Sequence, residues 1–115
     1  MYEIEFYDTN DGKCPIIEFL DSLEPKLKAK TLRTIDLLEH NGTELKAPFT
    51  KSLGSGLFEL RTKHSSNITR IFYFFYVEKK IILTNGFVKK TMRTPKSDIL
   101  LAKKYKADYE RRNNL

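Results

Sequence analysis

The chain has 115 residues, of which 21 are Lys or Arg and 15 are Asp or Glu, so its formal net charge is +6. Apolar residues make up 40% and aromatic residues 12% of the chain, which argues against intrinsic disorder. A chain of this length normally forms one core, so we expect residues 1–115 to be a single domain.

The single cysteine, Cys14, excludes an intramolecular disulfide and any site built from several thiolates. The first residues are acidic where a signal peptide would be basic, and the longest apolar run, residues 71–77, is far shorter than the roughly 20 residues of a membrane helix. We therefore expect a cytoplasmic protein with no membrane partner.

Residues 2–7 alternate apolar and acidic side chains, which is typical of a strand with one solvent-exposed face. Cys14-Pro15 then opens a short helix. A second helix is expected from Pro25 to Asn41-Gly42, because its leucines and isoleucine recur at helical spacing and glycine favours a helix end. Residues 42–56 contain three glycines and a proline and predict a connecting loop.

The alternation of residues 57–63 predicts a strand with Phe58, Leu60 and Thr62 toward the helices and the charged residues on the other face. Residues 68–77 and 81–88 are nearly continuous apolar runs, as in central strands covered on both faces. Short connections between these runs predict a three-stranded antiparallel meander. Thr94-Pro95 predicts the cap and first turn of a C-terminal helix, so the expected fold class is α+β.

Charge is distributed unevenly along the chain. Residues 1–48 carry six Lys or Arg against ten Asp or Glu, a net charge of −4, whereas residues 49–115 carry fifteen against five, a net charge of +10. Such a local excess attracts phosphate backbones, although a solvated basic face would have the same composition.

The candidate functional residues are cations on or beside the meander. Arg61 and Arg70 lie on neighbouring predicted strands and are expected to meet on one concave surface. Cations in this arrangement can bind successive phosphates and stabilise the extra negative charge of a pentacoordinate phosphorane. No glycine-rich phosphate loop, nucleophile elbow or metal-ligand spacing occurs, so we expect no cofactor and no metal.

Each candidate also has a structural interpretation. Arg70 could form an ion pair with Glu59, because it shares a face with phenylalanines and needs a partner. Arg61 and Lys63 could simply solvate a strand face, Lys89-Lys90 could promote solubility at a hairpin exit, and His64 could be a turn residue.

The order of elements, with Leu53-Gly-Ser-Gly-Leu-Phe-Glu-Leu-Arg61, Arg70-Ile-Phe-Tyr73, Gly86-Phe-Val-Lys-Lys90 and Thr94-Pro95, resembles the RelE superfamily of toxins. Within that superfamily, residues 2–110 are similar to the HigB branch, also described as phage-derived Gp49-like proteins. The resemblance depends on the combination of these motifs, because no single motif among them is specific enough.

The resemblance implies a small toxin with a microbial RNase-like sheet, from a type II toxin–antitoxin pair. Such a toxin enters the ribosomal A site and cuts mRNA, and its partner is a HigA-like helix-turn-helix antitoxin. The rival interpretation is a non-catalytic module of the same fold that binds RNA, the ribosome or a partner.

Carried over residue by residue, the resemblance places the catalytic cations at Arg61, Arg70 and Lys90, where they would orient the phosphate attacked by a 2′-hydroxyl. Four further cations would position the RNA: Lys63, Lys89, Arg93 and Lys96. This chain has Glu59 where RelE has a lysine, and Thr94-Pro95-Lys96 where RelE has a tyrosine. The identity of the general base stays open between Glu59 and His64.

Overall fold

The computed structural model describes residues 1–89 and 94–113. In chain order these residues form β1 (Glu3–Phe6), α1 (Pro15–Asp21), α2 (Pro25–Asn41), the 3-10 turn η1 (Gly42–Glu44), β2 (Thr50–Gly54), β3 (Leu57–His64), β4 (Asn67–Tyr76), β5 (Lys80–Lys89) and α3 (Lys96–Asn113). The predicted α+β class is confirmed, with an N-terminal strand, two helices, a meander and a C-terminal helix.

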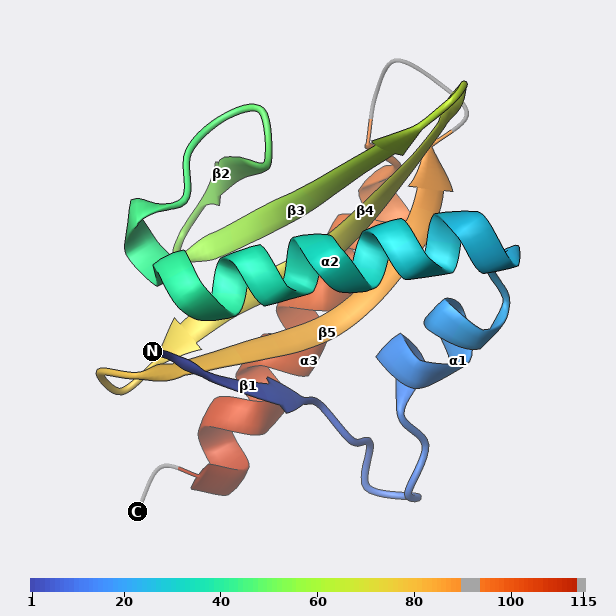
Figure 1. Cartoon of the computed structure of the whole chain (residues 1–115). Coiled ribbons are helices and arrows are strands. Elements are labelled where there is room, and N and C mark those ends of the chain that lie inside the picture. The colour runs from blue at the N-terminus through green and yellow to red at the C-terminus, as the bar shows by residue number, and fades with distance from the viewer. Residues whose placement is uncertain (90–93, 114–115) are drawn as a thin grey trace.

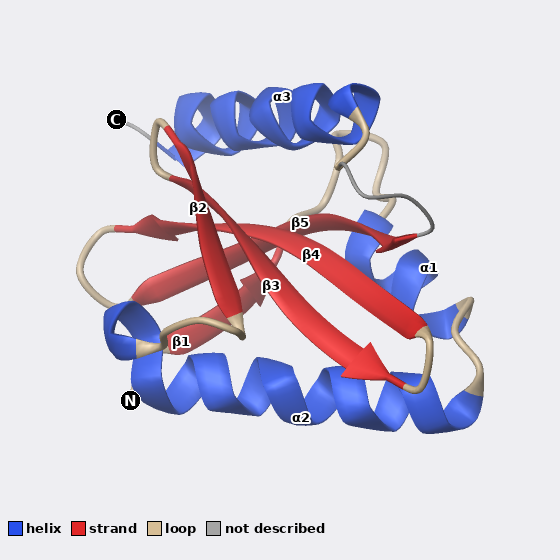
Figure 2. Cartoon of the chain, turned by 90° about the horizontal axis from the view of Figure 1, so that it is seen from above, coloured by secondary structure: helices blue, strands red, loops and turns tan. Residues whose placement is uncertain are grey.

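The strands form one sheet in the order β1-β5-β4-β3-β2. The β3–β4–β5 meander is antiparallel, as predicted, whereas β1 pairs in parallel with β5. Helices α1 and α2 cover one face of the sheet, and α3 covers the other (Figures 1 and 2). The continuous apolar runs of β4 and β5 are explained by this arrangement, because both strands lie inside the sheet and between helical layers.

The prediction that residues 42–56 form only a loop is wrong. The turn η1 and the strand β2 lie in this segment, and β2 pairs with β3 from Thr50 opposite Leu60 to Gly54 opposite Leu57. Most side chains of β2 are exposed, and Leu53 is its one large apolar residue. Such an edge strand shows no alternation of apolar and polar residues, because it is held in place by backbone pairing with β3 and not by the burial of side chains on one face.

Helix α2 forms where the sequence predicts it and is capped at both ends. Its first turn carries Pro25, and the Glu24 carboxylate accepts a hydrogen bond from the Leu27 amide at 2.7 Å. The helix ends at Gly42, which has a φ of +50° and lies against the Tyr2 ring; a Cβ at Gly42 would lie 2.0 Å from that ring.

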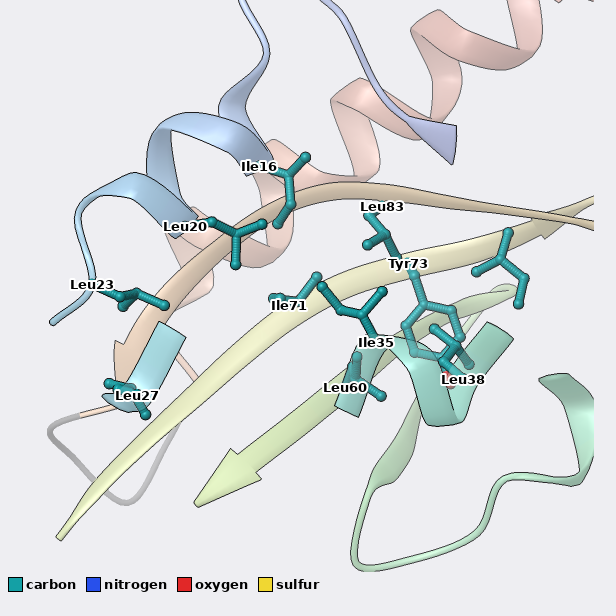
Figure 3. Packing of buried hydrophobic residues seen from close by; sticks show 11 residues of the cluster. Ile16, Leu20, Leu23, Leu27, Ile35, Leu38, Leu60, Ile71, Tyr73 and Leu83 are labelled. Carbon is teal, nitrogen blue, oxygen red and sulfur yellow. The ribbon is translucent and has the colours of Figure 1, made fainter. Parts of the chain in front are cut away.

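The main core lies between the sheet and helices α1 and α2 (Figure 3). The α2 residues Leu27, Ile35 and Leu38 pack against apolar side chains from three strands, including Leu60 and Tyr73. On the opposite face, the α3 residues Ala102 and Tyr109 cover Phe72 and Phe74, respectively, and the Tyr7 hydroxyl donates to Asp108 at 2.5 Å. The charged face of β3 therefore lies beside α3, where part of it is buried.

Two neighbouring leucines of α2 provide a matched test of this packing. Leu38 is fully buried, whereas Leu37 is 40% exposed. We expect L38A to lower the free energy of unfolding by about 2–5 kcal/mol, because it leaves a cavity in the core. L37A should lower it by less than about 1 kcal/mol. Urea denaturation of both variants measures the difference, and equal losses would contradict the packing described.

Candidate functional site

Arg61 and Arg70 lie directly opposite each other on β3 and β4. Residues that are directly opposite in an antiparallel pair project from the same face of the sheet, with their Cα atoms about 5 Å apart. The predicted meeting of the two arginines is therefore confirmed. Two guanidinium groups this close repel each other unless a negative charge lies between them.

Glu59 provides that negative charge. Its Oε1 accepts a hydrogen bond from Arg70 Nη1 at 2.5 Å, and Arg61 Nε lies 3.5 Å from the same oxygen. Its Oε2 accepts a hydrogen bond from the Thr94 hydroxyl at 2.5 Å. Glu59 is fully buried. The ion pair between Arg70 and Glu59, which the sequence left as one alternative, is thus present, and both carboxylate oxygens are engaged.

The contacts of Glu59 determine its charge. Burial alone would raise the pKa of this carboxyl, but the hydrogen bonds from Thr94 and Arg70, together with the charges of Arg70 and Arg61, lower the pKa below its ordinary value. Glu59 is therefore ionised at neutral pH. One negative charge then faces two arginines, so the cluster keeps a positive excess.

The two arginines differ in exposure. The Arg70 side chain is 5% exposed, whereas the Arg61 side chain is 29% exposed, so Arg61 is the guanidinium that reaches solvent. Arg70 Nε is buried and has no hydrogen-bond partner within the described residues. A buried donor of this kind is costly unless a ligand or water reaches it.

Further cations lie on the same face of the sheet. Lys63 follows Arg61 by two residues on β3, and Lys89 of β5 lies opposite Ile68 of β4. Burial, then the charges of Arg70 and Arg61, lower the pKa of Lys89. Lys51 of β2 lies directly opposite Glu59, and it was missed in the sequence because its strand was not predicted.

A groove of about 350 Å³ lies where β3 extends beyond the end of its pairing with β2. Pairing between β2 and β3 ends at Thr50 and Leu60, after which the Arg61 amide donates to the Phe49 carbonyl at 2.7 Å. Figure 2 shows β3 extending past β2. The groove is lined by Lys30 and Thr34 of α2, Pro48 and Phe49 of the preceding loop, Arg61, Thr62 and Lys63 of β3, and Ile68 and Arg70 of β4.

Other predicted site residues lie elsewhere. His64 lies opposite Asn67 at the end of β3, and by alternation it projects from the face opposite to Arg61. Lys96 is exposed at the start of α3. Lys90 and Arg93 lie outside the described residues. Thr94, predicted as a helix cap, instead donates its hydroxyl to Glu59, and α3 begins at Lys96.

Within residues 1–89 and 94–113, no three His, Cys, Asp or Glu side chains are grouped so that they could hold a metal ion. In the same part of the chain, none of the helices combines the length and the apolar character needed to cross a membrane.

Replacing Glu59 tests its role as the shared counter-charge. We expect E59Q to lower the free energy of unfolding by about 3 kcal/mol at neutral pH, because Arg70 then remains buried without a charged partner. A carboxylate with a lowered pKa stabilises the fold above its unfolded pKa, and this stabilisation is lost as pH falls through the folded pKa. The ordinary pKa of a glutamate carboxyl is about 4.5. Below that pH, the stability deficit of E59Q relative to the wild type should therefore become smaller.

Urea denaturation at neutral pH and at about pH 3 measures this deficit. The control is E44Q, since Glu44 is exposed and has no ion pair among the described residues. A deficit for E59Q that stays constant with pH would contradict the assignment.

Comparison with known families agrees with the motifs. The family model "Phage derived protein Gp49-like (DUF891)" matches residues 18–107, which is more than three quarters of the chain and includes Glu59, Arg61, Arg70 and Lys89. A search of curated proteins found no significant match. The predicted resemblance is confirmed: the chain belongs to the Gp49-like family of phage-derived proteins, which is a family of RelE- and HigB-like toxins.

Proposed function

We propose that the protein is a ribosome-dependent mRNA endoribonuclease, the toxin of a type II toxin–antitoxin pair. The observation that carries the proposal is the Arg61–Arg70 pair, fixed by buried Glu59 and opening into a groove lined by further cations. Its partners would be the ribosome, mRNA and a HigA-like helix-turn-helix antitoxin, all in the cytoplasm. A neighbouring gene for such an antitoxin would support the pairing.

In the proposed reaction, the 2′-hydroxyl of one nucleotide attacks the adjacent phosphate and the 5′-oxygen of the next nucleotide leaves. Negative charge builds up on the non-bridging oxygens in the transition state. Arg61, which reaches solvent, would bind these oxygens, while Glu59 holds Arg70 in a fixed orientation beside it. Donors that are already oriented stabilise the transition state without reorganisation. Lys90 belongs to the proposed site on the ground of the motif.

Proton transfer in this reaction needs an assignment other than Glu59 or His64, the two candidates that the sequence left open. Both oxygens of Glu59 are engaged, and His64 projects from the other face of β3. Lys89 lies on the arginine face, and its lowered pKa makes loss of its proton easier. We propose Lys89 as the group that accepts the proton of the 2′-hydroxyl, with Glu59 as a positioning residue.

The activity is tested by inducing the protein in cells and mapping the 5′ ends of transcripts during translation. We expect new ends within coding regions for the wild type. R61A should reduce their formation roughly 100-fold or more, as is typical for loss of one transition-state donor. The control is K103A, which removes an exposed lysine of α3 that does not line the groove. Unchanged cleavage by R61A would contradict the proposed site.

The role of Lys89 is tested by comparing K89R with K89A on ribosomes programmed with mRNA. Arginine keeps the positive charge but stays protonated. If Lys89 transfers the proton, K89R should bind mRNA like the wild type yet lose cleavage in a single turnover. If K89R cleaves at the wild-type rate, Lys89 serves only to hold phosphate.

A non-catalytic RNA- or partner-binding module is the competing function. The engagement of Glu59 and the position of His64 favour it, since neither of the bases expected from the sequence reaches the arginine face. This function predicts that the soluble wild-type protein binds ribosomes or RNA in a salt-dependent way while transcript ends stay normal.

A further inference from the structure

A second hollow adjoins the groove at the β3 edge. It has a volume of about 520 Å³, lies along the exposed side of α2, and is lined by Lys30, Arg33, Thr34, Asp36, Leu37, His40 and Phe49. Three of these residues, Lys30, Thr34 and Phe49, also line the groove at Arg61 and Arg70. The two hollows therefore adjoin at these three residues. Together they are called the depression, and their linings extend from the arginine pair, past the open edge of β3, to α2.

Helical spacing places the α2 residues of this depression in a row. Lys30, Arg33, Leu37 and His40 follow one another at intervals of three or four residues, so they share one side of the helix. The row is about 15 Å long at 1.5 Å per residue. It is long enough to contact several nucleotides beyond the one bound at Arg61.

Phe49 occupies the junction of the two hollows. It is 39% exposed, although it is a large apolar side chain, and no aromatic ring of the described residues stacks on it. Its carbonyl accepts a hydrogen bond from the Arg61 amide, and Phe49 lines the same groove as Arg61 and Arg70. An exposed aromatic ring beside a row of cations is the combination that binds single-stranded nucleic acid, because bases stack on the ring while cations follow the backbone.

The charges of the depression favour RNA over the apolar surface of a protein. Its cations are Lys30, Arg33, Arg61, Lys63 and Arg70, whereas Asp36 is the only carboxylate among the described residues that line it. Lys30, Arg33 and Lys63 have no ion-pair partner within the described residues. Covering these charges with an apolar surface would desolvate them without compensation. A phosphate backbone supplies one negative charge per nucleotide and leaves the cations hydrated.

We propose that this depression is a binding track for single-stranded RNA, in which a base stacks on Phe49 and Lys30 and Arg33 bind the phosphates that flank the one held at Arg61 and Arg70. The inference rests on the proposed function for the identity of the ligand as RNA, but it does not require cleavage. It adds contacts from α2 and from the loop before β2 to the site on the strands.

Binding is measured by fluorescence anisotropy with a single-stranded 2′-O-methyl RNA oligonucleotide. This probe lacks the attacking hydroxyl, so affinity is observed without cleavage. F49L keeps an apolar side chain but removes the π face, and we expect it to weaken binding roughly 5- to 150-fold, whereas F49Y should bind like the wild type. Thermal unfolding of both variants checks that they are folded.

The cations are tested through the salt dependence of binding. K30A and R33A should each reduce the slope of log K against log[salt] by about 0.7, the value for one phosphate contact on a single strand. The control K103A should leave the slope unchanged.

If F49L binds like F49Y, if K30A and K103A change the slope equally, or if the wild type shows no affinity for the oligonucleotide, the track is refuted. Normal transcript ends in cells, combined with the expected binding results, would refute the nuclease and leave the track intact.

Discussion

A buried carboxylate between two arginines is the interaction on which the rest of this structure depends. Arg61 and Arg70 are fixed opposite each other by the register of β3 and β4, so their repulsion cannot be relieved by moving either strand. Glu59, two residues before Arg61 on the same face, neutralises part of that charge. Its second oxygen holds Thr94, which leads into α3. The same carboxylate therefore connects the site to the helix that covers this face.

The charge balance of the cluster explains how it can be both stable and attractive to anions. A fully neutralised pair would have little affinity for phosphate, and an unneutralised pair would be too costly to bury. With one carboxylate for two arginines, Arg70 is buried and satisfied at one nitrogen, while Arg61 keeps a solvent-exposed guanidinium. The positive excess is thus concentrated on the side chain that can reach a ligand.

The sequence predicted the elements that burial determines. The period-two pattern of residues 57–63, the apolar runs of β4 and β5, and the limits of α2 were all correct, and the register of one hairpin was enough to bring Arg61 and Arg70 together. The position of His64 was not predicted correctly. The sequence predicts a turn from His64 to Asn67, whereas His64 is the last residue of β3 and projects from the face opposite to Arg61.

What could not be predicted depends on contacts between distant segments. The strand β2 is exposed and held by backbone pairing, so neither Lys51 nor the position of Phe49 had a local signal. The alternation of β3 correctly placed Glu59 on the charged face, but the burial of that residue depends on α3 and Thr94, which lie about 35 residues further along the chain.

The charge split along the sequence also needs a spatial interpretation. The N-terminal 48 residues carry a net charge of −4, yet two cations of this half, Lys30 and Arg33, line the depression that leads to the arginines. An anionic ligand responds to the surface that it meets rather than to the net charge of a chain segment, because exposed charges more than about 8 Å apart are largely screened at physiological salt. The acidic half of the chain therefore contributes two cations to a basic surface. Because β2 is short, the edge of β3 is left open, and this opening connects the cations of α2 with the arginines of β3 and β4.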